Sequence, residues 1–307
     1  MGKKGMLFPG QGSQKVGMGK DLCEAVPAAR EVYERASVAA GLDLARLCFD
    51  GPEAELNDTA VCQAAVLVTS IAALEAWKAR QGADAARADF TAGLSLGEYT
   101  ALVYARSIAF EDAVRLVRQR GIFMKEAAEQ NPGTMLTLLG MEREAVLDLV
   151  AACQGKGTLV AANFNSPGQI VLSGSVAAID AAEAEAKSRG AKRAVRLAVS
   201  GAFHSPLMEP AAARLRAELA RTAIQAPVIP LVSNVTAGYV TTADEVRDLL
   251  SRQLTSPVLW EDSMRFMIGE GMTEAVEVGP GRVLAGLLAK IGRNVAAKNI
   301  GSLADLG

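Results

Sequence analysis

Hydrophobic positions in the first third of the chain fall into short apolar runs and longer stretches with helical spacing. Residues 5–8 are apolar and end at Pro9, which predicts a short buried strand. Residues 21–40 and 58–81 predict helices, and the second has a nearly continuous apolar centre, as in helices buried in a protein interior. Residues 88–92 then predict a second buried strand.

The rhythm changes at about residue 132. A strand at 134–139 precedes a helix, two strands, a second helix and a last strand, at residues 142–153, 159–165, 169–173, 176–189 and 192–199. This β-α-β-β-α-β order is the ferredoxin-like one. We therefore predict a small ferredoxin-like domain at 132–199, inserted into a discontinuous domain made of residues 1–131 and 200–307.

The segments outside the insert alternate between strands and helices. After the insert we expect helices at 208–222 and 243–253, a proline-interrupted strand at 224–233, and a strand at 273–278 followed by a helix to residue 291. Such alternation is typical of an α/β fold with a mostly parallel sheet.

Composition narrows the class of protein. The 307 residues are 50% hydrophobic and 5% aromatic with a net charge of −2, so we expect neither nucleic acid nor an anionic membrane as a partner. The four cysteines lack metal-ligand spacing and the chain has a single histidine, which argues against a metal site and favours reduced, buried thiols. We see no secretory signal and no apolar run that we expect to cross a membrane, so we predict a cytoplasmic protein.

The stretch from Gly93 to Gly97 carries the clearest candidate chemistry. Gly-Leu-Ser-Leu-Gly lies between a predicted strand and a predicted helix, which is the pattern of a nucleophile elbow. The glycines allow strand and helix to approach closely, and the N–H of Leu96 is placed to face an oxyanion at the helix N-terminus. The alternative is an ordinary strand-to-helix turn in which Ser95 caps the helix.

A serine nucleophile needs a base, and His204 is the one histidine in the sequence. It follows Ser95 by 109 residues and lies in a loop of small residues, where the helix after the insert begins. A lone histidine is more often structural, but this one is also the only side chain whose ordinary pKa suits a base at neutral pH. The loop at residues 9–14 contains two glycines and is either a plain connection or a nest of N–H groups for an anion.

Six motifs in order resemble those of malonyl-CoA–acyl carrier protein transacylases, the enzymes of bacterial fatty-acid synthesis that load malonyl onto the carrier protein. They are residues 8–14 (FPGQGSQ), 93–99 (GLSLGEY), 120–124 (RGIFM), 165–169 (NSPGQ), 203–205 (FHS) and 253–258 (QLTSPV). The resemblance runs from about Phe8 to Gly281. It implies an α/β-hydrolase-like large domain and a cytoplasmic acyltransferase with a ping-pong mechanism.

The resemblance also implies a role for individual residues. Ser95 would be the nucleophile and His204 its base, oriented by a backbone carbonyl at Gln253. The backbone N–H groups of Gln11 and Leu96 would bind the oxyanion.

Two further roles concern the substrate. Arg120 would pair with the malonyl carboxylate, although without the family its sequence context favours a solvated helix face. Asn165 either lines the substrate cleft or is a turn residue before Ser166-Pro167.

CoA and phosphopantetheine thioesters would be substrates, so we expect no cofactor. We expect a monomer whose partners are malonyl-CoA and acyl carrier protein. Because such carriers are acidic, we expect a basic docking patch, with candidates at Arg118, Lys125, Lys187, Arg189 and Lys192.

Two other readings stay open from the residues alone. An esterase or thioesterase on the same turn would place an acidic side chain against His204 and would give Arg120 no role. A non-catalytic carrier-docking protein would need neither Ser95 nor His204. The family often has histidine before the nucleophile, where this chain has Leu94, and we expect that difference to affect packing rather than chemistry.

Overall fold

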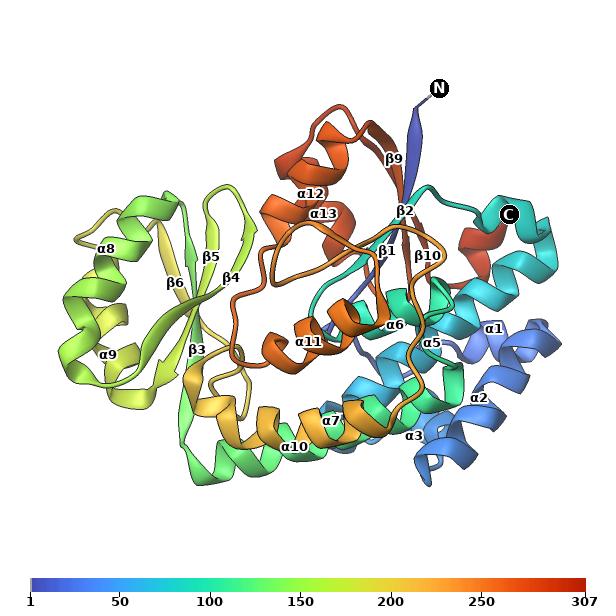
Figure 1. Cartoon of the computed structure of the whole chain (residues 1–307), viewed down its shortest axis with the longest axis horizontal. Helices are drawn as coiled ribbons and strands as arrows, with labels where there is room; N and C mark the ends of the chain where they lie inside the picture. The colour runs from blue at the N-terminus through green and yellow to red at the C-terminus, as the bar shows by residue number, and fades with distance from the viewer. Residues whose placement is uncertain (1) are drawn as a thin grey trace.

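The computed structural model describes residues 2–307 and contains two sheets (Figure 1). The larger sheet has its strands in the order β10-β9-β1-β2-β7-β8, and β8 runs antiparallel to β7 while the other neighbouring pairs are parallel. The strands are β1 (Lys3–Phe8), β2 (Phe90–Gly93), β7 (Leu231–Val232), β8 (Tyr239–Val240), β9 (Met272–Val278) and β10 (Ala296–Ile300). Parallel strands place the loops after β1, β2 and β9 at one edge.

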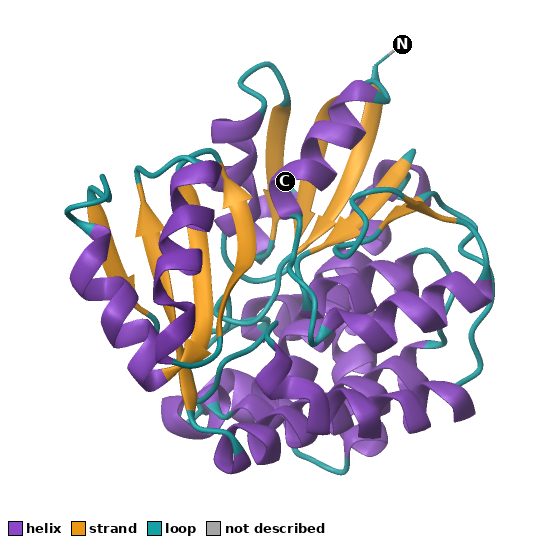
Figure 2. Ribbon diagram, turned by 60° about the vertical axis from the view of Figure 1, so that its left-hand side comes forward, coloured by secondary structure: helices purple, strands orange, loops and turns teal. Residues whose placement is uncertain are grey.

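Helices cover both faces of this sheet, because successive side chains of a strand point to opposite faces. On β1, Met6 and Phe8 pack into the core that includes α5, whereas Leu7 packs into the core under α12 and α13. Figure 2 shows the thick helical layer on the first side. The helices outside the small sheet are α1 (Lys20–Ala25), α2 (Pro27–Ala40), α3 (Leu44–Asp50), α4 (Glu53–Asn57), α5 (Thr59–Gln81), α6 (Leu96–Tyr104), α7 (Phe110–Gln130), α10 (Glu209–Arg221), α11 (Ala243–Gln253), α12 (Trp260–Gly269) and α13 (Val283–Ile291).

Helix α5 runs through the middle of the helical layer. By length and composition alone this helix is apolar enough to cross a membrane, although we expected no such segment from the sequence. However, 89% of its apolar window is buried inside the protein. A helix that is apolar on all sides is stable when protein surrounds it on all sides. Here α5 packs against α2 and α7 and forms the centre of the core.

The second sheet is antiparallel and has the order β4-β5-β3-β6. Its strands are β3 (Gly133–Leu139), β4 (Leu159–Ser166), β5 (Gln169–Ser175) and β6 (Arg193–Arg196), and its helices are α8 (Arg143–Cys153) and α9 (Val176–Ala186). Both helices cover the outer face, on the left of Figure 1, and share a separate apolar core with the sheet. The elements follow the β-α-β-β-α-β order that the sequence predicts.

Two predicted elements are wrong in detail. The helix expected at 21–40 is broken at Val26, which has extended backbone angles, and restarts with Pro27 at its first position. The strand expected at 224–233 shrinks to Leu231–Val232, because Pro227 and Pro230 have no N–H to give to a neighbouring strand. The sequence reading also missed α3, α4, α12, β8 and β10.

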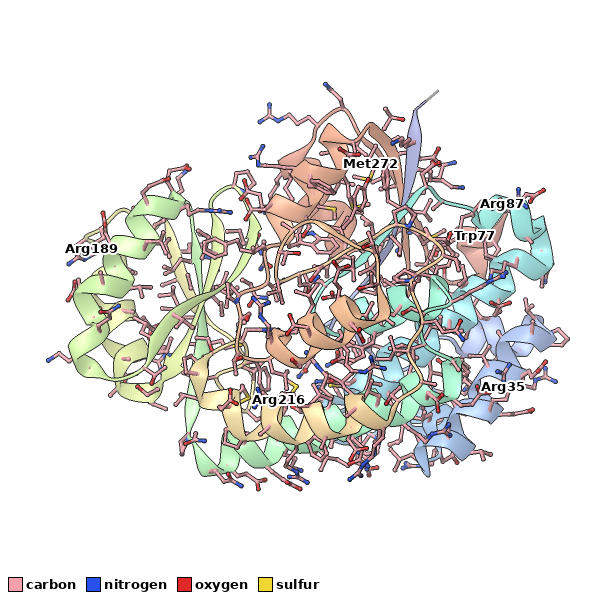
Figure 3. The ribbon with its side chains drawn as sticks, in the orientation of Figure 1. Arg35, Trp77, Arg87, Arg189, Arg216 and Met272 are labelled. Atoms are coloured by element: carbon pink, nitrogen blue, oxygen red, sulfur yellow. The ribbon has the colours of Figure 1, made fainter. Side chains whose placement is uncertain are left out.

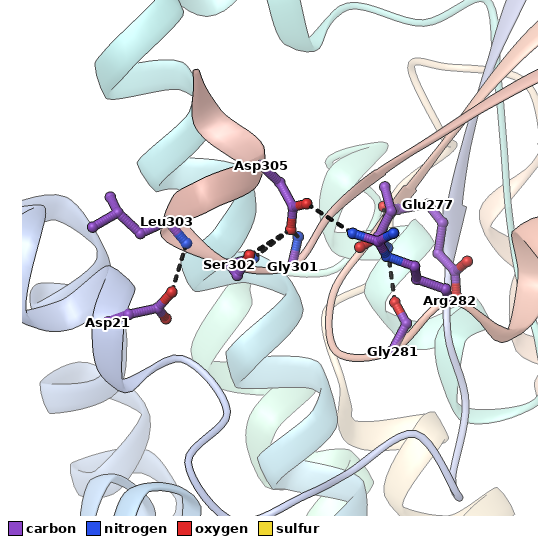
Figure 4. Close-up of polar contacts among 9 residues, drawn as sticks. Asp21, Glu277, Gly281, Arg282, Gly301, Ser302, Leu303 and Asp305 are labelled. Carbon is purple, nitrogen blue, oxygen red and sulfur yellow. Dashed lines mark hydrogen bonds and ion pairs between the residues drawn. The ribbon is translucent and has the colours of Figure 1, made fainter.

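The C-terminal segment closes over the edge where β9 and β10 end, and short 3-10 turns occur at Ala83–Ala86, Gln154–Lys156, Pro206–Met208 and Leu303–Leu306. The carboxylate of Asp305 accepts from the N–H groups of Gly301 and Ser302 and pairs with Arg282 at 3.2 Å (Figure 4). The N–H of Leu303 donates to Asp21 of α1 at 2.7 Å, which ties the segment to the N-terminal helices. The cysteines are free and buried within the described residues, as expected.

Candidate active site

The turn between β2 and α6 has the geometry of a nucleophile elbow. Ser95 adopts φ 51° and ψ −101°, an unfavourable conformation for a residue with a side chain. A Cβ on Gly93 would lie 1.9 Å from the carbonyl carbon of Gly97, and one on Gly97 would lie 2.1 Å from the carbonyl oxygen of Phe8. The two glycines are therefore required for strand, turn and helix to pack this closely.

Asn234 holds this strained turn from the loop after β7. Its Oδ1 accepts from the N–H of Ser95 at 2.5 Å, and its Nδ2 donates to the carbonyl of Gly93 at 2.7 Å. Asn234 is fully buried, so both bonds are shielded from water. Local sequence does not predict this role, since the only signal is a polar residue directly after the strand expected at 224–233.

His204 lies against the nucleophile. Its Nε2 is 2.8 Å from Ser95 Oγ, and its Nδ1 is 2.9 Å from the carbonyl oxygen of Gln253. A carbonyl can only accept, so Nδ1 carries the proton and Nε2 presents its lone pair to the serine hydroxyl. The partner at Nδ1 is thus a backbone carbonyl rather than an acidic side chain.

Burial and the positive charge of Arg120 lower the pKa of His204 to about 4. The side chain is only 5% exposed, and its interactions with backbone carbonyls oppose the shift without reversing it. The imidazole is therefore neutral at physiological pH and able to accept a proton.

Arg120 is buried beside Ser95 and not on a solvated helix face. Its Nη2 donates to Ser95 Oγ at 3.0 Å and to Gln253 Oε1 at 2.9 Å, and its Nη1 donates to Gln63 Oε1 at 2.7 Å. The side chain is 1% exposed, and its Nε has no partner among the residues that the structure describes. A buried guanidinium with a free N–H is suited to a carboxylate ligand.

A close helix–helix contact allows Arg120 to reach this position. A Cβ on Gly121 would lie 2.4 Å from the carbonyl oxygen of Thr59, so α7 approaches α5 through a glycine. Gln63 on α5 then meets the guanidinium, and neither its role nor the burial of Arg120 follows from local sequence.

Glu98 lies under the site, on α6, and its place in the motif at residues 93–99 does not by itself predict a role. It is 2% exposed, and its Oε2 accepts from Gln253 Nε2 at 2.7 Å and from the N–H of Asn234 at 3.3 Å. Burial raises its pKa to about 7.

A cavity of about 200 Å³ opens onto Ser95 and His204. One wall comes from the large sheet's loops, and the other from the small sheet. Its lining includes Gln11, Leu94, Asn165, Phe203 and Val283. The structure therefore places Gln11 and Asn165 at the cavity, and the Oδ1 of Asn165 is buried with no partner within residues 2–307.

Leu94 and Leu96 flank the nucleophile in different ways. Leu94 contributes apolar surface to the cavity wall. Leu96 is fully buried and is the first residue of α6, so its N–H has no partner within the helix. Arg120 itself is not part of the cavity lining and meets the cavity through Ser95.

Comparison with known proteins identifies the family of the chain. Residues 6–304 match the acyl transferase domain family. The malonyl CoA-acyl carrier protein transacylase of Bacillus subtilis (strain 168) is 46% identical over 296 residues, which cover 96% of this chain and 92% of that protein.

The solved structures that resemble this chain include transacylases. The malonyl-CoA:acyl carrier protein transacylase of Xanthomonas oryzae pv. oryzae is 42% identical with a TM-score of 0.95, covering 99% of this chain and 96% of that one. A malonyl-transacylase solved in complex with a type II PKS acyl-carrier protein is 39% identical with a TM-score of 0.95, covering 99% and 97%.

Proposed function

The chain belongs to the family of malonyl-CoA–acyl carrier protein transacylases, and from this premise we propose that Ser95 and His204 carry the reaction. The enzyme is an acyltransferase that moves malonyl from CoA to the phosphopantetheine thiol of acyl carrier protein. One observation supports the assignment most strongly: Ser95 Oγ lies 2.8 Å from His204 Nε2 and 3.0 Å from Arg120 Nη2.

In the first half-reaction, His204 Nε2 takes the proton of Ser95 as Oγ attacks the thioester carbonyl. The N–H groups of Gln11 and Leu96 stabilise the oxyanion that forms. The C–S bond then breaks, the imidazolium returns its proton to the CoA sulfur, and malonyl remains as an ester on Ser95. In the second half, His204 deprotonates the carrier thiol, the thiolate attacks the ester carbonyl, and the C–O bond breaks as the imidazolium returns the proton to Ser95 Oγ.

Arg120 selects the acyl group in this proposal. Its guanidinium, whose Nη2 lies 3.0 Å from Ser95 Oγ, binds the free carboxylate of malonyl. An acetyl group would leave the buried cation without that ligand, so acetyl-CoA is the poorer donor. Asn165, with its unpartnered Oδ1 at the cavity, is suited to a hydrogen bond with the substrate arm.

The carbonyl at His204 Nδ1 disfavours the thioesterase reading. That reading requires a carboxylate as the orienting group, whereas Gln253 O occupies this position. We also infer that CoA and phosphopantetheine act as substrates, without a cofactor.

We propose that the large sheet with its helices forms an α/β-hydrolase-like domain from residues 1–131 and 200–307, with 132–199 as the inserted ferredoxin-like domain. The strand order β4-β5-β3-β6 supports the second assignment. The cavity then lies between them, which suits a long thioester arm. A monomeric state and a cytoplasmic location stay predictions.

Fewer basic residues are free to bind the carrier protein than the sequence suggested. Lys125 pairs with Asp58 at 2.6 Å, and Arg118 donates to the carbonyl of Ala60. Arg189 is likewise paired, with Glu185 at 2.8 Å, and projects from the outer end of the small-sheet region (Figure 3). Lys187 and Lys192 are exposed. We propose these two lysines as the docking surface, and an unchanged carrier KM after charge reversal of Lys187 and Lys192 would exclude it.

The transfer itself is tested by the mass of holo carrier protein incubated with malonyl-CoA and enzyme. We expect one malonyl group on the holo form and none on the apo form, which lacks the thiol. Rapid CoA release without carrier would instead indicate a thioesterase.

A further inference from the structure

We propose that Glu98 is a positioning residue that orients Arg120 through the side-chain amide of Gln253 and so sets the preference for malonyl. This rests on the proposed function, in which Arg120 binds the malonyl carboxylate. Glu98 lies in the first turn of α6, Arg120 lies on α7, and the amide of Gln253 lies between them.

The amide has one orientation that satisfies all of its neighbours. Its Nε2 donates to Glu98 Oε2 at 2.7 Å and to the carbonyl oxygen of Ser95 at 3.1 Å. Its Oε1 accepts from Arg120 Nη2 at 2.9 Å. Because a carboxylate accepts but does not donate, ionised Glu98 forces Nε2 toward itself and Oε1 toward the guanidinium.

This arrangement solves an electrostatic problem. A buried guanidinium needs a compensating negative charge, but a carboxylate in direct contact would occupy the N–H groups that a substrate carboxylate requires. Glu98 and Arg120 are 2% and 1% exposed, and the intervening amide separates their charges while transmitting the orientation. Glu98 thereby supports the cation and leaves it available to malonyl.

The backbone of Gln253 has a different task. Its carbonyl oxygen holds His204 Nδ1 at 2.9 Å, and it is fixed by the end of α11 rather than by Glu98. Loss of the Glu98 charge should therefore disturb Arg120 more than His204. Malonyl transfer, which uses both, should fall further than acetyl transfer, which uses only His204.

The pH dependence should differ between the two substrates for the same reason. Burial raises the pKa of Glu98 to about 7, so its charge is present above that pH and is lost below it. The titratable groups that act on it are Arg120 from α7 and Tyr99, its neighbour on α6, while His204 and Cys62 lie around Arg120. Burial places the pKa of His204 at about 4 and those of Tyr99 and Cys62 at about 12. Arg120 stays protonated, so an acidic limb near pH 7 belongs to Glu98.

The experiment compares acylation of Ser95 by malonyl-CoA and acetyl-CoA in wild type, Glu98→Gln and Glu277→Gln. Glu277 is the matched control, because it is 1% exposed and accepts from the N–H groups of Leu284 and Ala285, away from Gln253. We expect Glu98→Gln to lower the malonyl-to-acetyl ratio of kcat/KM by about 10- to 100-fold, as for loss of a charged hydrogen bond. Glu277→Gln should keep the wild-type ratio.

Two further readouts separate positioning from a general effect on folding. Wild-type kcat/KM for malonyl-CoA should fall below about pH 7, and Glu98→Gln should lack that limb. Gln253→Met, which keeps the backbone carbonyl, should reproduce the loss of selectivity, and adding Glu98→Gln to it should cause no further loss.

A wild-type ratio in Glu98→Gln, or additive losses in the double variant, would overturn the inference while leaving the function standing. Absence of a malonyl adduct on the wild type would overturn the function and this inference with it.

Discussion

Two strand-to-helix turns at the same edge of the large sheet differ in which residues adopt unfavourable backbone angles. The β2–α6 turn and the β9–α13 turn follow the two strands that flank β1. At β9–α13, the unfavourable backbone angles fall on Gly279 with φ 135° and Gly281 with φ 84°. At β2–α6, they fall on Ser95 with φ 51°.

The helix N-termini differ as well. The carboxylate of Glu277 accepts from two N–H groups of the first turn of α13, at 3.1 Å and 2.9 Å (Figure 4 shows Glu277 beside Arg282). The corresponding carboxylate near α6, Glu98, points to Gln253 instead. The N–H of Leu96 is thus left to the proposed oxyanion. A turn becomes reactive when strain falls on a nucleophile and the first N–H of the helix, here that of Leu96, stays unpaired.

The largest expected effect comes from the base at the reactive turn. His204→Ala should lower Ser95 acylation by about 10⁴-fold, because the serine loses its proton acceptor. Time-resolved intact mass measures this rate. Residual acylation within tenfold of wild type would show that another group removes the proton.

The helical glycines after the two turns should respond in opposite directions. Gly97→Ala places a Cβ 2.1 Å from the carbonyl oxygen of Phe8 and should cost about 3 kcal/mol of the free energy of unfolding. Gly286→Ala, on α13, meets nothing within 4 Å and should stabilise by about 0.5–1 kcal/mol. Denaturant unfolding measures both, and equal effects would contradict the tight packing at the reactive turn.

Arg120→Lys keeps the positive charge but removes the planar fork of donors. We expect malonyl acylation to fall by about 10²-fold, because lysine cannot pair with the buried malonyl carboxylate through two parallel N–H groups. Acetyl acylation should change little, because acetyl has no carboxylate. Parallel kcat/KM measurements with both thioesters check this. An equal fall with both would exclude Arg120 as the selector.

The stability of Glu98→Gln relative to wild type should depend on pH. The pKa of Glu98 is raised from 4.5 to about 7, so native wild type holds a proton that its unfolded state releases in this window. Wild type therefore loses stability as pH rises from 4.5 to 7, and the variant does not. Relative to wild type, the variant should gain about 3 kcal/mol of unfolding free energy between pH 4.5 and pH 8. The titration of His204 does not affect this comparison, because both proteins contain His204. A difference in unfolding free energy that does not change with pH would refute the raised pKa of Glu98.

The smallest effect tests the strain itself. Ser95→Gly should gain about 1 kcal/mol of unfolding free energy, because glycine adopts φ 51° without penalty. Gly281→Ser, in a comparably open place of the second turn, should lose about 1 kcal/mol. If Ser95→Gly destabilises the protein, the turn is not strained as we describe.

Local patterns were sufficient for the turn and for the small sheet. Gly93, Ser95 and Gly97 are close in sequence, so their geometry follows from a few residues. The strands and helices of the small sheet follow from periodicity alone. The break at Pro27 was also visible in the sequence, and the long predicted helix ignored it.

The supporting residues were not predictable in this way. Asn234, Glu98 and Gln63 meet their partners across separations of 57 to 155 residues, and local sequence does not show these contacts, even for Glu98 within the motif at 93–99. The burial of Arg120 depends on Gly121 and the contact between α7 and α5. Its role came from the family resemblance, because an arginine among charged neighbours on a helix otherwise indicates a solvated face.

The most direct test is to map the covalent adduct after brief incubation with malonyl-CoA. We predict a single malonyl group on the peptide that contains Ser95, absent from Ser95→Ala and removed by holo carrier protein. A malonyl group on another residue, or the same adduct in Ser95→Ala, would contradict the assignment of the reactive turn.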